Sequence, residues 1–386
     1  GISVDSGKKF TVYGQTNDTN LMGILNSRTQ TTTGVASAGI GGSGKGKTSG
    51  VITINGGRVT ASGSREAGGA GIGGGFNASG GTTVINGGVV TVPTRKSVAG
   101  IGGGREGSGG NITINGGTVN AGGYAGAAIG GAYHGSAGNI TINGGTVTAT
   151  DGTRGAAIGS GEKKNGNTNA GTIRINGGTV IARNTAGSGS GGAAIGGGYN
   201  VPGGTIIITG GEVTATSVYG AGIGGGPGAN GGKVTISGGT VTAYCSSGGA
   251  GIGRGNGGKN HGTLTVADDH VCRAGDSEST AGACFNYQSH RKKWVKIWQH
   301  IHSEITYGIE GNVLTATCTN DVDNCNLVDG KLTLTLTAPN KLYDAKVYDK
   351  AKTAWISVNH NEWDEFSKIT GTTASSPTRR PRTFRT

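Results

Sequence analysis

Two short motifs alternate along residues 38–266, and both recur every 28 to 37 residues in register with each other. The first is Ala/Gly-Ala/Gly-Ile-Gly-Gly/Ser, and the second is Ile-x-Ile-Asn-Gly-Gly-x-Val-Thr. A period of this length is typical of one supersecondary unit that stacks on its neighbours, because a single unit cannot bury its apolar face alone. The isoleucine of the first motif, here called the repeat isoleucine, stands at Ile40, Ile72, Ile101, Ile129, Ile158, Ile195, Ile223 and Ile252.

One repeat can be interpreted residue by residue. In Ile140-Thr-Ile142 the alternation places two isoleucines on one face of a strand and the threonine on the other. Asn143-Gly-Gly145 then predicts a turn, because Gly and Asn tolerate a positive φ better than other residues. Val147, in a second short strand, faces the same way as the isoleucines. Aligned repeats give two apolar columns, Ile54, Ile85, Ile114, Ile142, Ile175, Ile208 and Ile236, and Val59, Val90, Val119, Val147, Val180, Val213 and Val241.

These columns predict an all-β chain: a parallel β-helix of about eight coils, followed by a small β-sandwich-like module. Stacked parallel coils place like residues on like at about 4.8 Å. An antiparallel hairpin array, for which Asn-Gly-Gly is also a signal, explains columns spaced at one whole repeat less well. The 85 glycines among 386 residues are then corner residues, not a sign of disorder or of collagen. The corner asparagines are expected to form a structural amide ladder: Asn55, Asn86, Asn115, Asn143 and Asn176.

The chain is expected to divide into four segments. Glycine becomes less frequent after the repeats, all four tryptophans lie in the later region, and Lys331–Thr337 alternates as a strand does. We therefore predict an N-terminal cap at 1–37, β-helix repeats at 38–272, a C-terminal β-rich module at 273–371 and a disordered basic tail at 372–386.

Part of the chain resembles a known group of proteins. Ala70-Gly-Ile-Gly-Gly-Gly75, Ile140-Thr-Ile-Asn-Gly-Gly-Thr-Val-Thr-Ala149 and Ala221-Gly-Ile-Gly-Gly-Gly226 are similar to the glycine-rich GxGIGGG and ITINGGTVTA repeats of large surface proteins from Gram-positive gut and soil bacteria. Ser303–Ala351 resembles the segment after the repeats in such proteins, so the resemblance covers about three quarters of the chain. It implies an adhesin-type, carbohydrate-binding-like protein that is extracellular, either secreted or attached to the cell wall.

The sparse acidic residues argue against an enzyme. Glycan-cleaving β-helices need clustered carboxylates, as an acid/base pair or as Ca²⁺ ligands. Five acidic residues are spread over the repeats, mostly at irregular loop positions, and are poor material for such a cluster: Glu66, Glu106, Asp151, Glu162 and Glu212.

The net charge of +12 comes from basic residues that are scattered through the repeats without forming a block. A solvated surface accounts for them, although a diffuse positive field also favours anionic polymers; no nucleic-acid partner is predicted. No run of about 18 apolar residues occurs, so no membrane span is predicted. The chain begins Gly1-Ile-Ser-Val4 without Met, and we expect a processed chain or a fragment of a longer protein.

Five cysteines occur, four of them at or beyond the end of the last coil. No Cys-x-x-Cys pair is present, so disulfides are favoured over zinc and no metal site is predicted, although nearby histidines keep zinc as an alternative. The expected pairs are Cys272 with Cys284 and Cys318 with Cys325, which leaves Cys245 unpaired.

Aromatic residues recur at one position of the repeat. Four residues after the repeat isoleucine, three coils carry Phe or Tyr, and two further tyrosines lie just before the same strand. Aromatic faces along a groove suit sugar rings; the alternative is that these rings only cover the exposed edge of a glycine-rich wall. The candidate glycan contacts are Phe76, Arg105, Tyr124, Tyr133, His134, Tyr199 and Tyr219.

Together these observations predict a non-enzymatic extracellular bacterial surface protein. We expect a rigid stalk or adhesin that contacts host or bacterial glycans along the solenoid and uses no cofactor. One alternative is a polysaccharide-active enzyme of the parallel β-helix type. Another is a fibre subunit whose coils stack end to end where the caps are weak. An ice-binding face is not expected, because the most Thr-rich column is interrupted at Asn120 and Ile181.

Overall fold

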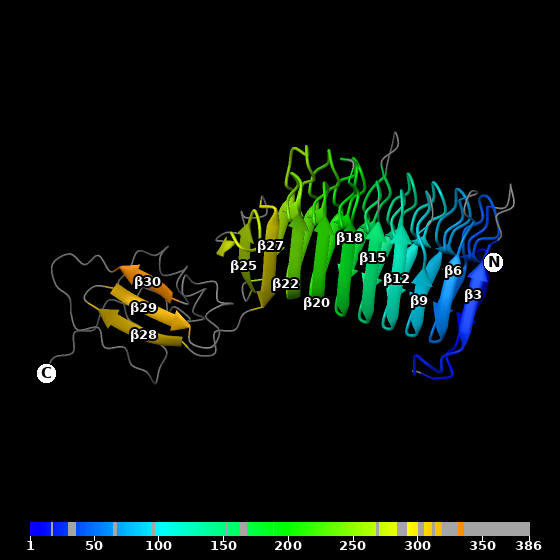
Figure 1. Ribbon diagram of the computed structural model, residues 1–386, viewed down its shortest axis with the longest axis horizontal. Helices are drawn as coiled ribbons and strands as arrows, with labels where there is room; N and C mark the ends of the chain where they lie inside the picture. The colour runs from blue at the N-terminus through cyan, green and yellow to red at the C-terminus, as the bar shows by residue number, and fades with distance from the viewer. Residues whose placement is uncertain are drawn as a thin grey trace, which may run out of the picture. The chain divides into compact units, whose positions relative to one another are not determined.

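The computed structural model is a solenoid of parallel β-strands, and a separate unit holds a three-stranded sheet (Figure 1). The fold prediction is confirmed, because the chain forms a parallel β-helix of about eight turns, and the described residues contain no helix. The structure describes residues 305–310, 313–318 and 331–335, together with residues 1–299 except 17, 30–35, 65–67, 95–96, 152, 163–167, 188, 268–269 and 284–291.

Each turn contributes one strand to each of three walls, and each strand pairs in parallel with its equivalent in the next turn. The first wall contains β2 (Lys9–Val12), β5 (Val51–Ile54), β8 (Thr82–Ile85), β11 (Asn111–Ile114), β14 (Asn139–Ile142), β17 (Thr172–Ile175), the first halves of β20 (Thr205–Ser217) and β22 (Lys233–Cys245), and β24 (Thr263–Val266). The second wall contains β3 (Ile24–Arg28), β6 (Arg58–Ser62), β9 (Val89–Val92), β12 (Thr118–Gly123), β15 (Thr146–Asp151), β18 (Thr179–Asn184) and the second halves of β20 and β22. The third wall contains β1 (Ile2–Ser3), β4 (Ile40–Gly41), β7 (Ile72–Gly73), β10 (Ile101–Gly102), β13 (Ile129–Gly130), β16 (Ile158–Gly159), β19 (Ile195–Gly196), β21 (Ile223–Gly224) and β23 (Ile252–Gly253).

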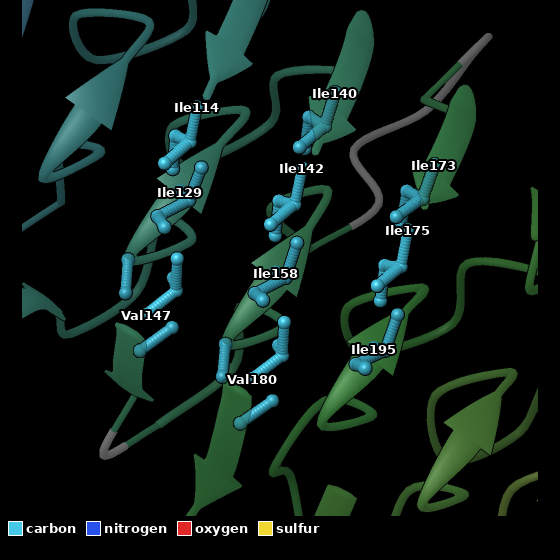
Figure 2. Packing of buried hydrophobic residues seen from close by; sticks show 14 of the residues in the cluster. Ile114, Ile129, Ile140, Ile142, Val147, Ile158, Ile173, Ile175, Val180 and Ile195 are labelled. Atoms are coloured by element: carbon cyan, nitrogen blue, oxygen red, sulfur yellow. The ribbon is translucent and has the colours of Figure 1, made fainter. Parts of the chain in front are cut away.

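The apolar columns predicted from the repeats form the core. Ile142 pairs with Ile114 and Ile175, and Val147 pairs with its equivalents in the same way. Every isoleucine and valine of the two columns is at most 1% exposed, as is every repeat isoleucine of the third wall. Figure 2 shows the set Ile142, Ile158 and Val147 recurring in the neighbouring turns. Burial of one such side chain contributes about 1.5–3 kcal/mol, so the stacked columns are the main source of stability.

The third wall depends on the glycine that comes after each repeat isoleucine. This glycine has φ between 130° and 145° in every turn from Gly41 to Gly253, a conformation that L side chains rarely adopt. A Cβ on Gly130 would overlap the carbonyl oxygen of Gly159 in the next turn. The absence of side chains at this position therefore lets successive turns approach closely.

The corner asparagines form a directed hydrogen-bond ladder. Each Nδ2 group donates to Oδ1 of the asparagine in the preceding turn. The first of these bonds runs from Asn86 to Asn55 at 2.7 Å, and the last runs from Asn176 to Asn143 at 2.8 Å. The hydroxyl of Thr209 donates to Oδ1 of Asn176 at 2.9 Å and so extends the ladder by one turn. The side-chain amides therefore hydrogen-bond to one another along the solenoid axis. This structural role accounts for the row of asparagines without a catalytic one.

The two ends differ from the predicted segment boundaries. Residues 2–28 form a complete first turn, because β1, β2 and β3 pair in register with β4, β5 and β6. At the other end β27 (Trp294–Gln299) pairs antiparallel with the second half of β22 and with β25 (His270–Gly275), which also pairs with β26 (Gly282–Ala283). Because of this pairing the first unit ends at Gln299 and not at the predicted residue 272.

The second unit runs from His300 to Thr386. Its described residues form an antiparallel sheet of β28 (Ile305–Glu310), β29 (Val313–Cys318) and β30 (Lys331–Thr335). The strand predicted from Lys331 is therefore present. The remaining residues of the predicted β-sandwich-like module and of the predicted tail at 372–386 lie outside the described residues.

A buried carboxyl group occupies the corner between the second and third walls. Asp151, at the end of β15, is 0% exposed, and its ladder neighbours are Gly123 and Asn184. Its Oδ1 accepts a hydrogen bond from the amide of Thr153 at 2.7 Å, whereas Oδ2 has no partner among the described residues. Burial raises the pKa of Asp151 well above its ordinary value, so the folded chain keeps this carboxyl group protonated at pH values where the unfolded chain has already released the proton.

Replacement Asp151→Asn is expected to change the pH dependence of stability. The unfolded chain releases this proton near pH 4 and the folded chain only at a higher pH, so the wild type loses stability as pH rises between the two values. The loss is up to about 1.4 kcal/mol per pH unit in that window. Denaturant unfolding at pH values rising from 4 should therefore favour Asp151→Asn increasingly within that window, and Asp276→Asn, at an exposed aspartate, is the matched control. Parallel curves for wild type and Asp151→Asn would contradict the argument.

Candidate functional site

After each strand of the third wall the backbone bends sharply, and the conformation of this bend recurs along the solenoid. From Asn77 onward, the fifth residue after the repeat isoleucine has a positive φ in every turn where this residue is described, for example 65° at Glu106 and 64° at His134. The amide of this fifth residue donates a hydrogen bond to the carbonyl of the fourth residue in the next turn. The amide of Asn77 donates to Arg105 at 2.7 Å, and that of Glu106 donates to Tyr133 at 2.9 Å. These bonds and the register of the third wall align the fourth residues of successive turns in a row, here called the rim column: Phe76, Arg105, Tyr133, Glu162 and Tyr199.

Cations lie over the aromatic rings of the rim column. The guanidinium carbon of Arg105 is 5.9 Å from the ring centroid of Phe76 and 5.7 Å from that of Tyr133. Lys45 Nζ is 5.8 Å from the Phe76 ring, and Arg154 is 5.7 Å from the Tyr199 ring. Contacts of this kind stabilise by about 0.5–1 kcal/mol at exposed sites. The rings are therefore held by neighbouring turns and are not free platforms on all sides.

Glu162 connects three residues of the rim. Its carboxylate is buried, and Oε2 accepts a hydrogen bond from Arg154 Nη1 at 2.9 Å, while Oε1 is 3.3 Å from His134 Nε2. The hydrogen bond from the Tyr133 hydroxyl to this carboxylate raises the pKa of Tyr133. The same carboxylate raises the pKa of Arg154. The charge of Glu162 is thus compensated within the rim.

The predicted glycan contacts do not all fall in one place. Phe76, Arg105, Tyr133 and Tyr199 stand in the rim column, and the His134 ring lies against the Tyr133 ring with centroids 3.7 Å apart. The other two predicted residues belong to loops between the second and third walls. Tyr219 borders the rim through its carbonyl, which accepts from the amide of Asn256, and its hydroxyl is 3.5 Å from the Gly187 carbonyl. Tyr124 is 45% exposed, and no contact joins it to the column within the described residues.

The sequence alone does not identify Glu162 and Arg154 as part of this site. In the sequence Glu162 is one scattered acidic residue among five, although it occupies the same repeat position as the aromatic rings. Arg154 comes from a different loop, eight residues earlier, and reaches Glu162 only when the two loops of this turn lie together. The repeat position is a usable signal for Glu162, whereas no repeat position marks Arg154.

The described cysteines are buried. Cys245 is a free thiol whose Sγ is 3.3 Å from the Val218 carbonyl, and burial raises its pKa. Cys272 in β25 is fully buried and disulfide-bonded, with a partner side chain that lies outside the described residues. Cys284, Cys325 and the side chain of Cys318 are also outside them, so the predicted pairing stays a prediction.

Neither a metal site nor a membrane-spanning element is found in the part of the chain that the structure describes. No three His, Cys, Asp or Glu side chains in that part gather closely enough to hold a metal ion. Those residues likewise form no apolar helix of membrane-spanning length.

Comparison with known proteins agrees with the architecture. A family model described as Beta helix repeat matches residues 52–76, 84–105, 112–133, 140–162, 206–227 and 234–253. Each match except the last runs from the first wall to the rim column or its equivalent position, and the unmatched turn at 172–199 pairs in the same register as its neighbours. A search of curated proteins and a search of solved structures found no match. By its fold the chain is a parallel β-helix, and six segments of its repeat region are similar to the Beta helix repeat family.

Proposed function

We propose that this protein is a non-enzymatic extracellular surface protein, in which the rigid solenoid serves as a stalk or adhesin and contacts host or bacterial glycans through the rim column. The observation that carries the proposal is the row of rings at one repeat position, Phe76, Tyr133 and Tyr199, on a backbone stacked in register. All three rings are partly exposed. Successive coils lie about 4.8 Å apart, so the rings are separated by whole multiples of that distance. Rings at such a regular spacing suit the successive apolar faces of a sugar chain.

The alternative of a polysaccharide-active enzyme receives less support from this site. Glycoside hydrolysis needs two carboxyl groups that flank one bond. Glu162 is the only carboxylate of the rim column as defined from the described residues, and it is buried and ion-paired with Arg154. An end-to-end fibre is also less favoured, because β27 pairs antiparallel on the last complete turn of the second wall.

Removal of two rings tests the proposal. The variant Tyr133→Ala with Tyr199→Ala is expected to lose about tenfold or more in affinity for any glycan that the wild type binds, since two aromatic contacts of about 0.5–1.5 kcal/mol each are removed. The measurement is a glycan array followed by calorimetric titration. Tyr13→Ala is the matched control, because this tyrosine is 77% exposed at a different corner of the first turn. An array without any wild-type binding, or equal affinity of both variants, would refute glycan contact by the rim.

A further inference from the structure

We infer that Arg105 is an anchor for the carboxylate of an acidic sugar, so that the rim column recognises acidic rather than neutral glycans. This inference rests on the proposed function and specifies its ligand. Its basis is the difference between the surroundings of two arginines: Arg105, which is in the rim column, and Arg154, which contacts the column through Glu162.

Arg154 already has its acidic partner. Its guanidinium donates to Glu162 at 2.9 Å, and Glu162 is buried beside it. Arg105 instead contacts the rings of Phe76 and Tyr133, and its Nε is buried without a hydrogen-bond acceptor among the described residues. A guanidinium carries five N–H donors in a fixed planar fork. The Arg105 fork is therefore held in position by ring contacts, while hydrogen-bonding capacity remains for a ligand.

An oxyanion is the ligand that best satisfies this group. A carboxylate accepts two parallel N–H bonds from one guanidinium, and such charge-assisted bonds are about twice as strong as neutral ones. The flanking rings of Phe76 and Tyr133 offer apolar surface for the sugar that bears the carboxylate. Binding thus joins a ring contact and an ionic contact within adjacent turns.

The charges of the surrounding rim agree with an acidic ligand. Lys45 is exposed and lies over the Phe76 ring, two turns before Arg105. Among the described residues, the acidic ones near Arg105 are Glu162, which Arg154 compensates, and Glu106, which has interactions of its own. Within the described residues, the stretch of the solenoid from Lys45 to Tyr133 therefore presents two cations to a ligand, and the acidic groups beside them are engaged.

The test compares one sugar chain in two charge states. Oligogalacturonate and its fully methyl-esterified form differ only in the carboxylate, and we expect the wild type to bind the acid about tenfold or more tightly. Arg105→Gln should remove most of this preference. Arg174→Gln should retain it, because Arg174 is an exposed arginine on the outward side of the first wall. Calorimetric titration gives the affinities, and circular dichroism checks that each variant is folded.

The outcomes separate the inference from the proposed function. Equal wild-type affinity for acid and ester would overturn the carboxylate anchor and leave glycan contact by the rings intact. An equal loss in Arg105→Gln and Arg174→Gln would also overturn it, since the effect would then be one of general charge. Binding of neither oligosaccharide, nor of any other on an array, would overturn both. If Arg105→Gln does not fold, equal wild-type affinity for the acid and the ester still overturns the inference.

Discussion

Gly130→Ala is expected to destabilise the solenoid by more than about 4 kcal/mol, a loss that is exceptional for a single substitution and here combines backbone strain with a steric overlap. Gly130 has φ of 131°, where an alanine is strained, and the new methyl group would overlap the carbonyl oxygen of Gly159. The neighbouring turns cannot move apart without losing the parallel pairing of Ile129 with Ile158. Denaturant unfolding followed by circular dichroism measures the effect.

Gly187→Ala is the matched control for this prediction. A Cβ at Gly187 meets no atom within 4 Å, and its φ lies outside the region that favours glycine. Its stability should stay within about 0.5 kcal/mol of the wild type. If both alanine variants unfolded at the same denaturant concentration as the wild type, the close approach of turns at the third wall would not be needed for stability.

Ile142→Ala should cost about 2–5 kcal/mol, because the cavity that it leaves lies in a core that the stacked turns cannot close. Ile142 is 0% exposed and stands between Ile114 and Ile175 in the first wall. Because a solenoid unfolds by neighbouring units, hydrogen exchange should rise first in β11, β14 and β17.

Thr141→Ala provides the control on the same strand. Thr141 faces outward from β14 and is partly exposed, so its replacement should change the free energy of unfolding by about 0.5 kcal/mol or less. Similar losses for Thr141→Ala and Ile142→Ala would mean that the inward column does not determine stability.

The core is largely predictable because it depends on alternation and on the repeat. The positions of Ile54, Ile142 and Val147 in the motif predict that they face inward, and all are fully buried. The candidate site is predictable only in part. The recurrence of aromatic residues gives Phe76, Tyr133 and Tyr199 a common position, but it cannot show that Arg105 lies over two rings of the column. Nor can it show that Arg154 neutralises Glu162.

The first compact unit extends beyond the predicted end of the repeats at residue 272 for a related reason. Glycine becomes less frequent after Val266 and the corner motif disappears, so the sequence indicates the end of the repeats near residue 272. Trp294–Gln299 nevertheless belongs to the first unit, because it pairs antiparallel with Thr240–Tyr244 across about 50 residues of chain. A pairing at that separation has no local sequence signal, since it depends on which edge strand is exposed once the turns have stacked.

The sequence alone predicts which side chains face inward and where the repeated turns bend, but not that residues 2–28 form a further complete turn. These properties depend on alternation within a strand and on residues that tolerate a positive φ, and both are local. Which side chains are neighbours in the rim column and at the corners becomes visible only in the tertiary structure. The Glu162–Arg154 ion pair joins two loops of one turn, Arg105 lies between rings of the two adjacent turns, and Asp151 is buried at the end of β15. Their neighbours are set by stacking along the axis, which the order of residues in one turn does not encode.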